Sequence, residues 1–146
     1  MKKTGPLATI IIGFIAGLAI SGVLGDLIVF ANNSAGRVSA ALSVSRAEKL
    51  IAGGNFEQAA YQYRKALKKI NPENKKLTAK TKNNLGICVF TVAEQKRDTE
   101  GVKEAILIFL ESLEIYKEMS DAESVKQVET NIFEAKEFLK TLIPNS

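Results

Sequence analysis

A long apolar segment near the N-terminus sets the first limit on what this chain can fold into. Residues 7–31, LATIIIGFIAGLAISGVLGDLIVFA, include a single charged residue, Asp26. The uncharged part, residues 7–25, would be about 28 Å long as a helix, close to the ~30 Å hydrocarbon core of a bilayer. A soluble helix would show a polar face, and this segment does not. The sequence therefore predicts a transmembrane helix within an N-terminal anchor, residues 1–31.

Small residues recur along one side of this predicted helix, at Gly13, Gly17, Ser21 and Gly25. Membrane helices associate through close van der Waals packing, which rows of small residues permit. We expect this face to pack on a transmembrane helix of another subunit, or on a second copy of this chain. The alternative is that glycine is merely frequent in membrane helices. Asp26 would lie near the far interface, reaching either water or a donor on a neighbouring protein.

The residues flanking the segment indicate its orientation in the membrane and whether it is cleaved. Lys2 and Lys3 precede it, and the positive-inside rule then favours a cytoplasmic N-terminus and an extracytoplasmic domain. The residues before Asn32, Val29-Phe30-Ala31, also fit a signal peptide that is cleaved after Ala31. Against cleavage, the apolar run exceeds the usual length of about 7–15 residues.

The composition limits the chemistry that the chain can perform. It has no histidine, the commonest general base and metal ligand, and one cysteine, which rules out a disulfide framework. Cys88 lies among apolar neighbours, so we expect it to be buried and unreactive. The sequence predicts neither an enzyme nor a cofactor or metal site.

Charge divides the chain into two halves. Residues 37–97 hold 13 Lys or Arg and 4 Glu, whereas residues 98–140 hold 5 Lys and 11 acids. The basic part suits anionic lipid or an acidic partner, or is simply a solvated face. Nucleic acid does not fit, because no aromatic residues interleave with the basic ones. The basic patch consists of Arg64, Lys65, Lys68, Lys69, Lys75 and Lys76.

Beyond a polar linker at residues 32–37, apolar positions at helical spacing predict a domain of about five helices over residues 38–146. We expect helices at 38–52, 56–70, 75–93, from 102 onward, and at 122–142. Gly53-Gly54 and Pro72 end the first two, a charged break at 94–101 separates the third and fourth, and Asp121 caps the fifth.

An internal repeat relates the second and fourth predicted helices. Each of six apolar residues in the second helix has a counterpart 46 residues later in the fourth. The pairs are Phe56 and Val102, Ala59 and Ala105, Ala60 and Ile106, Tyr63 and Phe109, Leu67 and Leu113, and Ile70 and Tyr116.

The first repeat unit contains Gly54-Asn55-Phe56, Ala59, Tyr63, Ala66-Leu67 and Pro72, and the second contains Asn84-Leu85-Gly86, Val89, Ala105, Phe109 and Leu113. With these residues, the stretch 38–142 resembles tetratricopeptide repeats, which are stacked antiparallel helix pairs. The repeat interval departs from the family's value of about 34, and Ser112 stands where the family has alanine. Plain helical hairpins that share the pattern are the alternative.

The resemblance implies an all-α fold, an N-terminal transmembrane helix followed by a stack of helical hairpins, that binds a protein partner on its concave side. The family's clamp for a terminal carboxylate is not expected, because Val44 and Glu48 stand at its positions. Lys80 and Asn84 remain suited to an acidic segment. The implied partner groove is Val44, Glu48, Ile51, Lys80, Asn83, Asn84, Ile87 and Phe90.

Together these features predict a non-enzymatic, single-pass membrane protein that acts through protein–protein contacts. The leading hypothesis is an accessory subunit of a larger membrane complex. The alternatives are a membrane-bound assembly factor or scaffold, a homo-oligomer formed through the small-residue stripe, and a secreted repeat protein released by signal cleavage.

Overall fold

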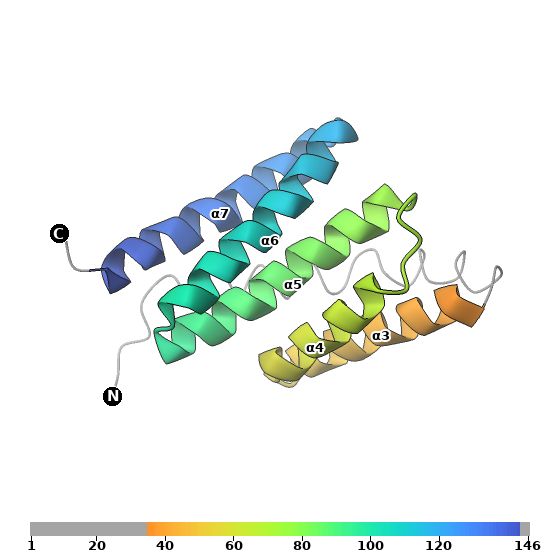
Figure 1. The fold of residues 1–146 in the computed structure, drawn as a ribbon, viewed down its shortest axis with the longest axis horizontal. Coiled ribbons are helices and arrows are strands. Elements are labelled where there is room, and N and C mark those ends of the chain that lie inside the picture. Colours follow the sequence, from red (N-terminus) through yellow and green to blue (C-terminus); the bar gives the residue numbers. More distant parts are fainter. Residues whose placement is uncertain (1–34, 144–146) are drawn as a thin grey trace.

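The computed structural model describes residues 35–143, with side chains from Val38 onward. Over this range the chain forms five α-helices and no strand. Figure 1 shows α5 lying between the α3–α4 pair and the α6–α7 pair. The helices are α3 (Ala35–Ala52), α4 (Phe56–Leu67), α5 (Lys75–Lys96), α6 (Thr99–Glu118) and α7 (Ala122–Leu142).

The turns between helices use backbone conformations that the local sequence supplies. Gly54 ends α3 with a φ of +76°, and the amide of Asn55 donates to the carbonyl of Leu50 at 2.8 Å. Arg97 ends α5 in the same left-handed region, at a φ of 52°. Asp121 caps α7 as expected, because its carboxylate accepts from the amide of Ser124 at 3.1 Å.

The core is built from the apolar faces that the internal repeat identifies. In α4 and the turn after it, Ala59, Ala60, Tyr63 and Ile70 are buried, and their counterparts in α6 are buried as well. Phe56 and Leu67 pack against this core while partly buried. The two helices therefore present equivalent faces at the 46-residue interval.

The middle of α5 is buried on every side, since all seven residues from 85 to 91 are buried. Gly86 permits the closest approach to α6. A β-carbon at this position would lie 2.6 Å from the ring of Phe109, which is itself 1% exposed. The glycine thus sets the distance between these two helices.

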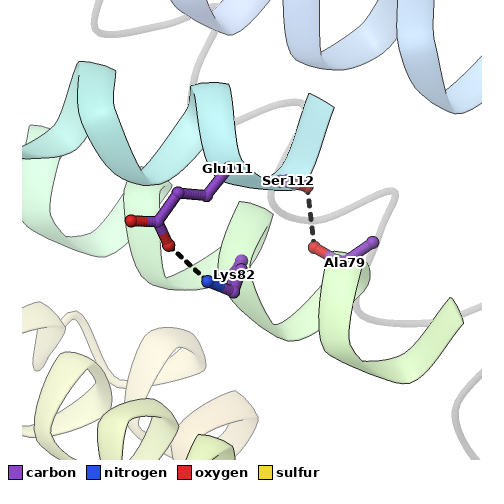
Figure 2. A network of polar contacts seen from close by, with 4 residues as sticks. All are labelled: Ala79, Lys82, Glu111 and Ser112. Carbon is purple, nitrogen blue, oxygen red and sulfur yellow. Dashed lines mark hydrogen bonds and ion pairs between the residues drawn. The ribbon is translucent and has the colours of Figure 1, made fainter. Parts of the chain in front are cut away.

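Polar contacts also join α5 to α6 (Figure 2). The hydroxyl of Ser112, which is fully buried, donates to the backbone carbonyl of Ala79 at 2.8 Å. Nearby, Lys82 forms an ion pair with Glu111. The Ser112 hydroxyl therefore has a structural role, because it bonds a carbonyl oxygen of the neighbouring helix.

The prediction of an all-helical domain with about five helices is confirmed, and α7 has the predicted bounds. Other boundaries differ. α3 already begins at Ala35, inside the stretch expected to be linker, and α4 ends at Leu67, where a turn follows in which the amides of Lys69 and Ile70 both donate to the carbonyl of Ala66. The break expected at 94–101 shrinks to the two residues Arg97 and Asp98, since the charged residues beside them form exposed helix ends.

No helix within residues 35–143 is long and apolar enough to cross a membrane. The predicted transmembrane segment, residues 7–31, lies outside the described residues.

Candidate partner-binding face

The face that carries the predicted groove is formed by α3, α5 and α7, and is called the inner face below. Along α5 it follows Lys80, Asn84, Ile87 and Glu94, which recur at helical spacing. From Lys80 to Glu94 the α5 backbone rises about 21 Å. The inner face therefore has a basic residue near one end and an acidic residue near the other.

Two of the predicted groove residues on α5 are engaged by α7. The side-chain oxygen of Asn83 accepts a hydrogen bond from Asn131 at 3.0 Å, and both residues are buried. The ring of Phe90 meets that of Phe138 edge to face, with centroids 5.9 Å apart. These residues attach α7 to α5.

Two further groove residues, Val44 and Ile87, belong to the buried core, and Ile51 packs against it while partly buried. Both Val44 and Ile87 are less than a tenth exposed, so their side chains have little surface to offer a partner.

The remaining groove residues, Glu48, Lys80 and Asn84, are brought together by the fold, and each is half-buried. The side-chain amide of Asn84 donates to the Tyr63 hydroxyl at 3.4 Å. Burial raises the pKa of Glu48, and the positive charge of Lys80 on the neighbouring helix partly offsets this rise. The accessible polar part of the predicted groove is therefore this group of three.

Two acidic residues farther along the inner face were missed by the sequence reasoning. Glu94 on α5 and Glu134 on α7 are half-buried, and burial raises the pKa of each carboxyl. The charge of Glu94 raises the pKa of Glu134 further, so the two carboxylates repel each other.

The role of α7 in the inner face also went unrecognised. Asn131 lies 48 residues after Asn83, and Phe138 lies 48 residues after Phe90. These two identities at one interval match the parallel register of α5 and α7, but residue identity alone does not indicate a contact.

Cys88 is fully buried, as expected. Burial raises the pKa of its thiol to about 12, although the charge of Arg64 opposes the shift. The side chain therefore remains a thiol at neutral pH, and it packs as a small apolar group.

Two of the six members of the basic patch form ion pairs within residues 38–143, and the other four do not. Arg64 contacts Glu104 at 2.8 Å, and Lys75 contacts Glu118 at 2.8 Å. Within residues 38–143, no carboxylate lies within 4.0 Å of the ammonium groups of the other four members. Those four are Lys65, Lys68, Lys69 and Lys76.

A hollow of about 240 Å³ opens between α4, α5 and the start of α6. The charged residues that line this hollow already have partners. Arg64 and Glu104 form the ion pair described above, and Glu57 forms an ion pair with Lys96. The carboxylate of Asp98 accepts a hydrogen bond from the amide of Glu100, in the first turn of α6. In the part of the chain with described side chains, no cluster of three or more His, Cys, Asp or Glu could hold a metal ion.

The predicted transmembrane packing face, Gly13, Gly17, Ser21, Gly25 and Asp26, lies outside the described residues. Comparison of the chain with protein-family models, with curated proteins and with solved structures finds no match in any of the three.

Proposed function

We propose that this chain is a single-pass membrane protein whose helical domain binds another protein on the inner face. In this proposal it is a non-enzymatic accessory subunit of a larger membrane complex. Residues 7–31 cross the bilayer, with the N-terminus in the cytoplasm, and the small-residue stripe packs against a helix of a neighbouring subunit.

The observation that carries the proposal is the group Glu48, Lys80 and Asn84. Polar side chains of two helices converge there, half-buried, beside the apolar centre of α5. A site of this kind supplies specific hydrogen-bonding and charged groups next to apolar area, which is how protein interfaces combine specificity with affinity. The equivalent buried faces of α4 and α6 support the further proposal that the domain is a tetratricopeptide-like repeat.

The absence of an enzymatic role in this proposal rests on the chemistry of the side chains. The chain has no histidine, and its one thiol is held in the protonated form by burial. The half-buried carboxylates Glu94 and Glu134 have no nucleophile or cofactor loop beside them in the sequence.

The test is extraction of the full-length chain from its native membrane in mild detergent, with mass spectrometry of the intact chain and of co-purifying proteins. A constant ratio to one large complex supports an accessory subunit. Recovery only with incomplete assemblies would favour the alternative, an assembly factor or scaffold. A mature chain beginning at Asn32 would overturn the anchor and leave a secreted repeat protein.

Two variants assign the contacts. Lys80→Glu should lower recovery of the partner by about tenfold, the change expected for the loss of about 1.4 kcal/mol of binding. Lys103→Glu, on the exposed side of α6, is the matched control and should leave recovery unchanged. Gly17→Ile should release the complex through the membrane contact instead. Unchanged recovery with both Lys80→Glu and Gly17→Ile would contradict the proposal.

A further inference from the structure

The end of the domain where α3 begins is also the end where α4 stops and α5 starts. The ammonium group of Lys69, just beyond α4, donates a hydrogen bond to the hydroxyl of Ser39 in the second turn of α3. This contact joins residues 30 positions apart in the chain. The C-terminal end of α4 therefore lies beside the point where the described chain begins.

Positive charge without an ion-pair partner collects at this end. Its members are Lys65, Lys68, Lys69 and Lys76, called the basic end below, and three of them are exposed. None has a carboxylate within 4.0 Å among residues 38–143. Lys76 is near enough to help lower the pKa of the Asp121 carboxyl but is beyond ion-pair distance.

Some of the other basic residues of this half do form ion pairs within residues 38–143. Arg64, Lys82 and Lys96 each form an ion pair with a glutamate on a neighbouring helix. The fold thus uses part of the positive charge of residues 37–97 in ion pairs and leaves the four lysines of the basic end outside such pairs, with Asp121 acting on Lys76 from beyond ion-pair distance.

The chain length between the anchor and the domain fixes how far the basic end can be from a bilayer. Only residues 32–34 separate Ala31 from the first residue of α3. Even fully extended, this connection spans at most about 14 Å. That upper limit is less than twice the Debye length at physiological ionic strength, about 8 Å, over which charged lipid attracts protein cations.

We propose that the basic end docks on the anionic phospholipid headgroups of the bilayer that residues 7–31 cross. This inference rests on the anchor in the proposed function. α5 leads away from the basic end, so docking directs the inner face outward from the membrane, with Lys80 near the lipid and Glu94 far from it. The partner would then meet the acidic part of the inner face first.

The test uses the full chain in lipid nanodiscs, either of phosphatidylcholine alone or with about 30 mol% phosphatidylserine, a fraction chosen to give a negative surface potential. Lysines are labelled with a water-soluble acylating reagent and read by mass spectrometry. We expect the four lysines of the basic end to react at least about threefold more slowly in the anionic discs. High salt should abolish the difference, because it screens the attraction.

Lys136 and Lys140, near the C-terminal end of α7, serve as internal controls and should react equally in both discs. The variant Lys68→Gln/Lys69→Gln should reduce the protection of Lys65 and Lys76. Lys136→Gln/Lys140→Gln, which removes the same charge from the other end, should leave that protection intact.

Equal labelling in both discs, with the chain inserted, would overturn the docking and leave the anchor standing. A chain that enters neither disc would overturn the anchor and the docking together. Protection seen in native membranes but in neither disc would identify an acidic protein as the occupant and would also contradict docking on lipid.

Discussion

At the scale of single residues, two small residues determine how closely α5 and α6 pack. Gly86 leaves room for the Phe109 ring, and the Ser112 hydroxyl bonds the Ala79 carbonyl. Both lie where the helices cross, so neither position tolerates added volume.

Gly86→Ala tests this close approach. The new methyl group would overlap the buried ring of Phe109, and overpacking of this kind costs about 1–3 kcal/mol. We expect a loss in this range in urea unfolding, although alanine favours the helix. Gly53→Ala, at an exposed turn, should change stability by less than about 0.5 kcal/mol. Equal effects of the two substitutions would refute the packing argument.

The burial of Glu134, together with its repulsion by Glu94, predicts a pH effect. The pKa of Glu134 is higher in the folded state than its ordinary value, so the folded state binds the proton more tightly. Its charged form therefore opposes folding at neutral pH, and this cost disappears as the pH falls below the unfolded-state value of 4.5. Glu134→Gln should raise Tm at pH 7 by about 2 °C and have little effect at pH 4.

Glu114→Gln, on the exposed face of α6, is the control for the loss of a negative charge. A gain at pH 7 that is equal in the two variants would trace the effect to net charge and not to the Glu94–Glu134 pair.

At the scale of helices, α7 is attached to α5 by one hydrogen bond and one aromatic contact. The amides of Asn83 and Asn131 are buried and bonded to each other, so removing one leaves the other unsatisfied. Asn83→Ala should therefore cost about 1–3 kcal/mol in urea unfolding.

The double variant Asn83→Leu/Asn131→Leu removes both polar groups and should cost less than the two single Leu substitutions added together. Additive losses would mean that the two amides do not depend on each other. Circular dichroism of each variant checks that α7 remains helical.

At the scale of the whole molecule, the sequence predicted the helices and the buried faces of α4 and α6, because apolar periodicity reports directly which side of a helix is buried. The sequence predicted too long a turn between α5 and α6. Charged residues such as Lys96 are common both in loops and at exposed helix ends, so their presence does not distinguish the two. The sequence also placed Asn83 in an open groove. A polar residue on a helix does not reveal its partner, and here that partner is 48 residues away in α7.

The order in which the helices contact one another has a consequence for synthesis. The most extensive contacts join helices adjacent in the chain, with α5 and α7 the next substantial pair within residues 35–143. Hairpins of this kind can form while the chain is still emerging from the ribosome. The apolar centre of α5, however, is covered only when α6 and α7 have followed, about 50 residues later. At roughly 5–20 residues per second, residues 85–91 stay partly uncovered for several seconds, and apolar surface exposed in this way makes a nascent chain prone to aggregation.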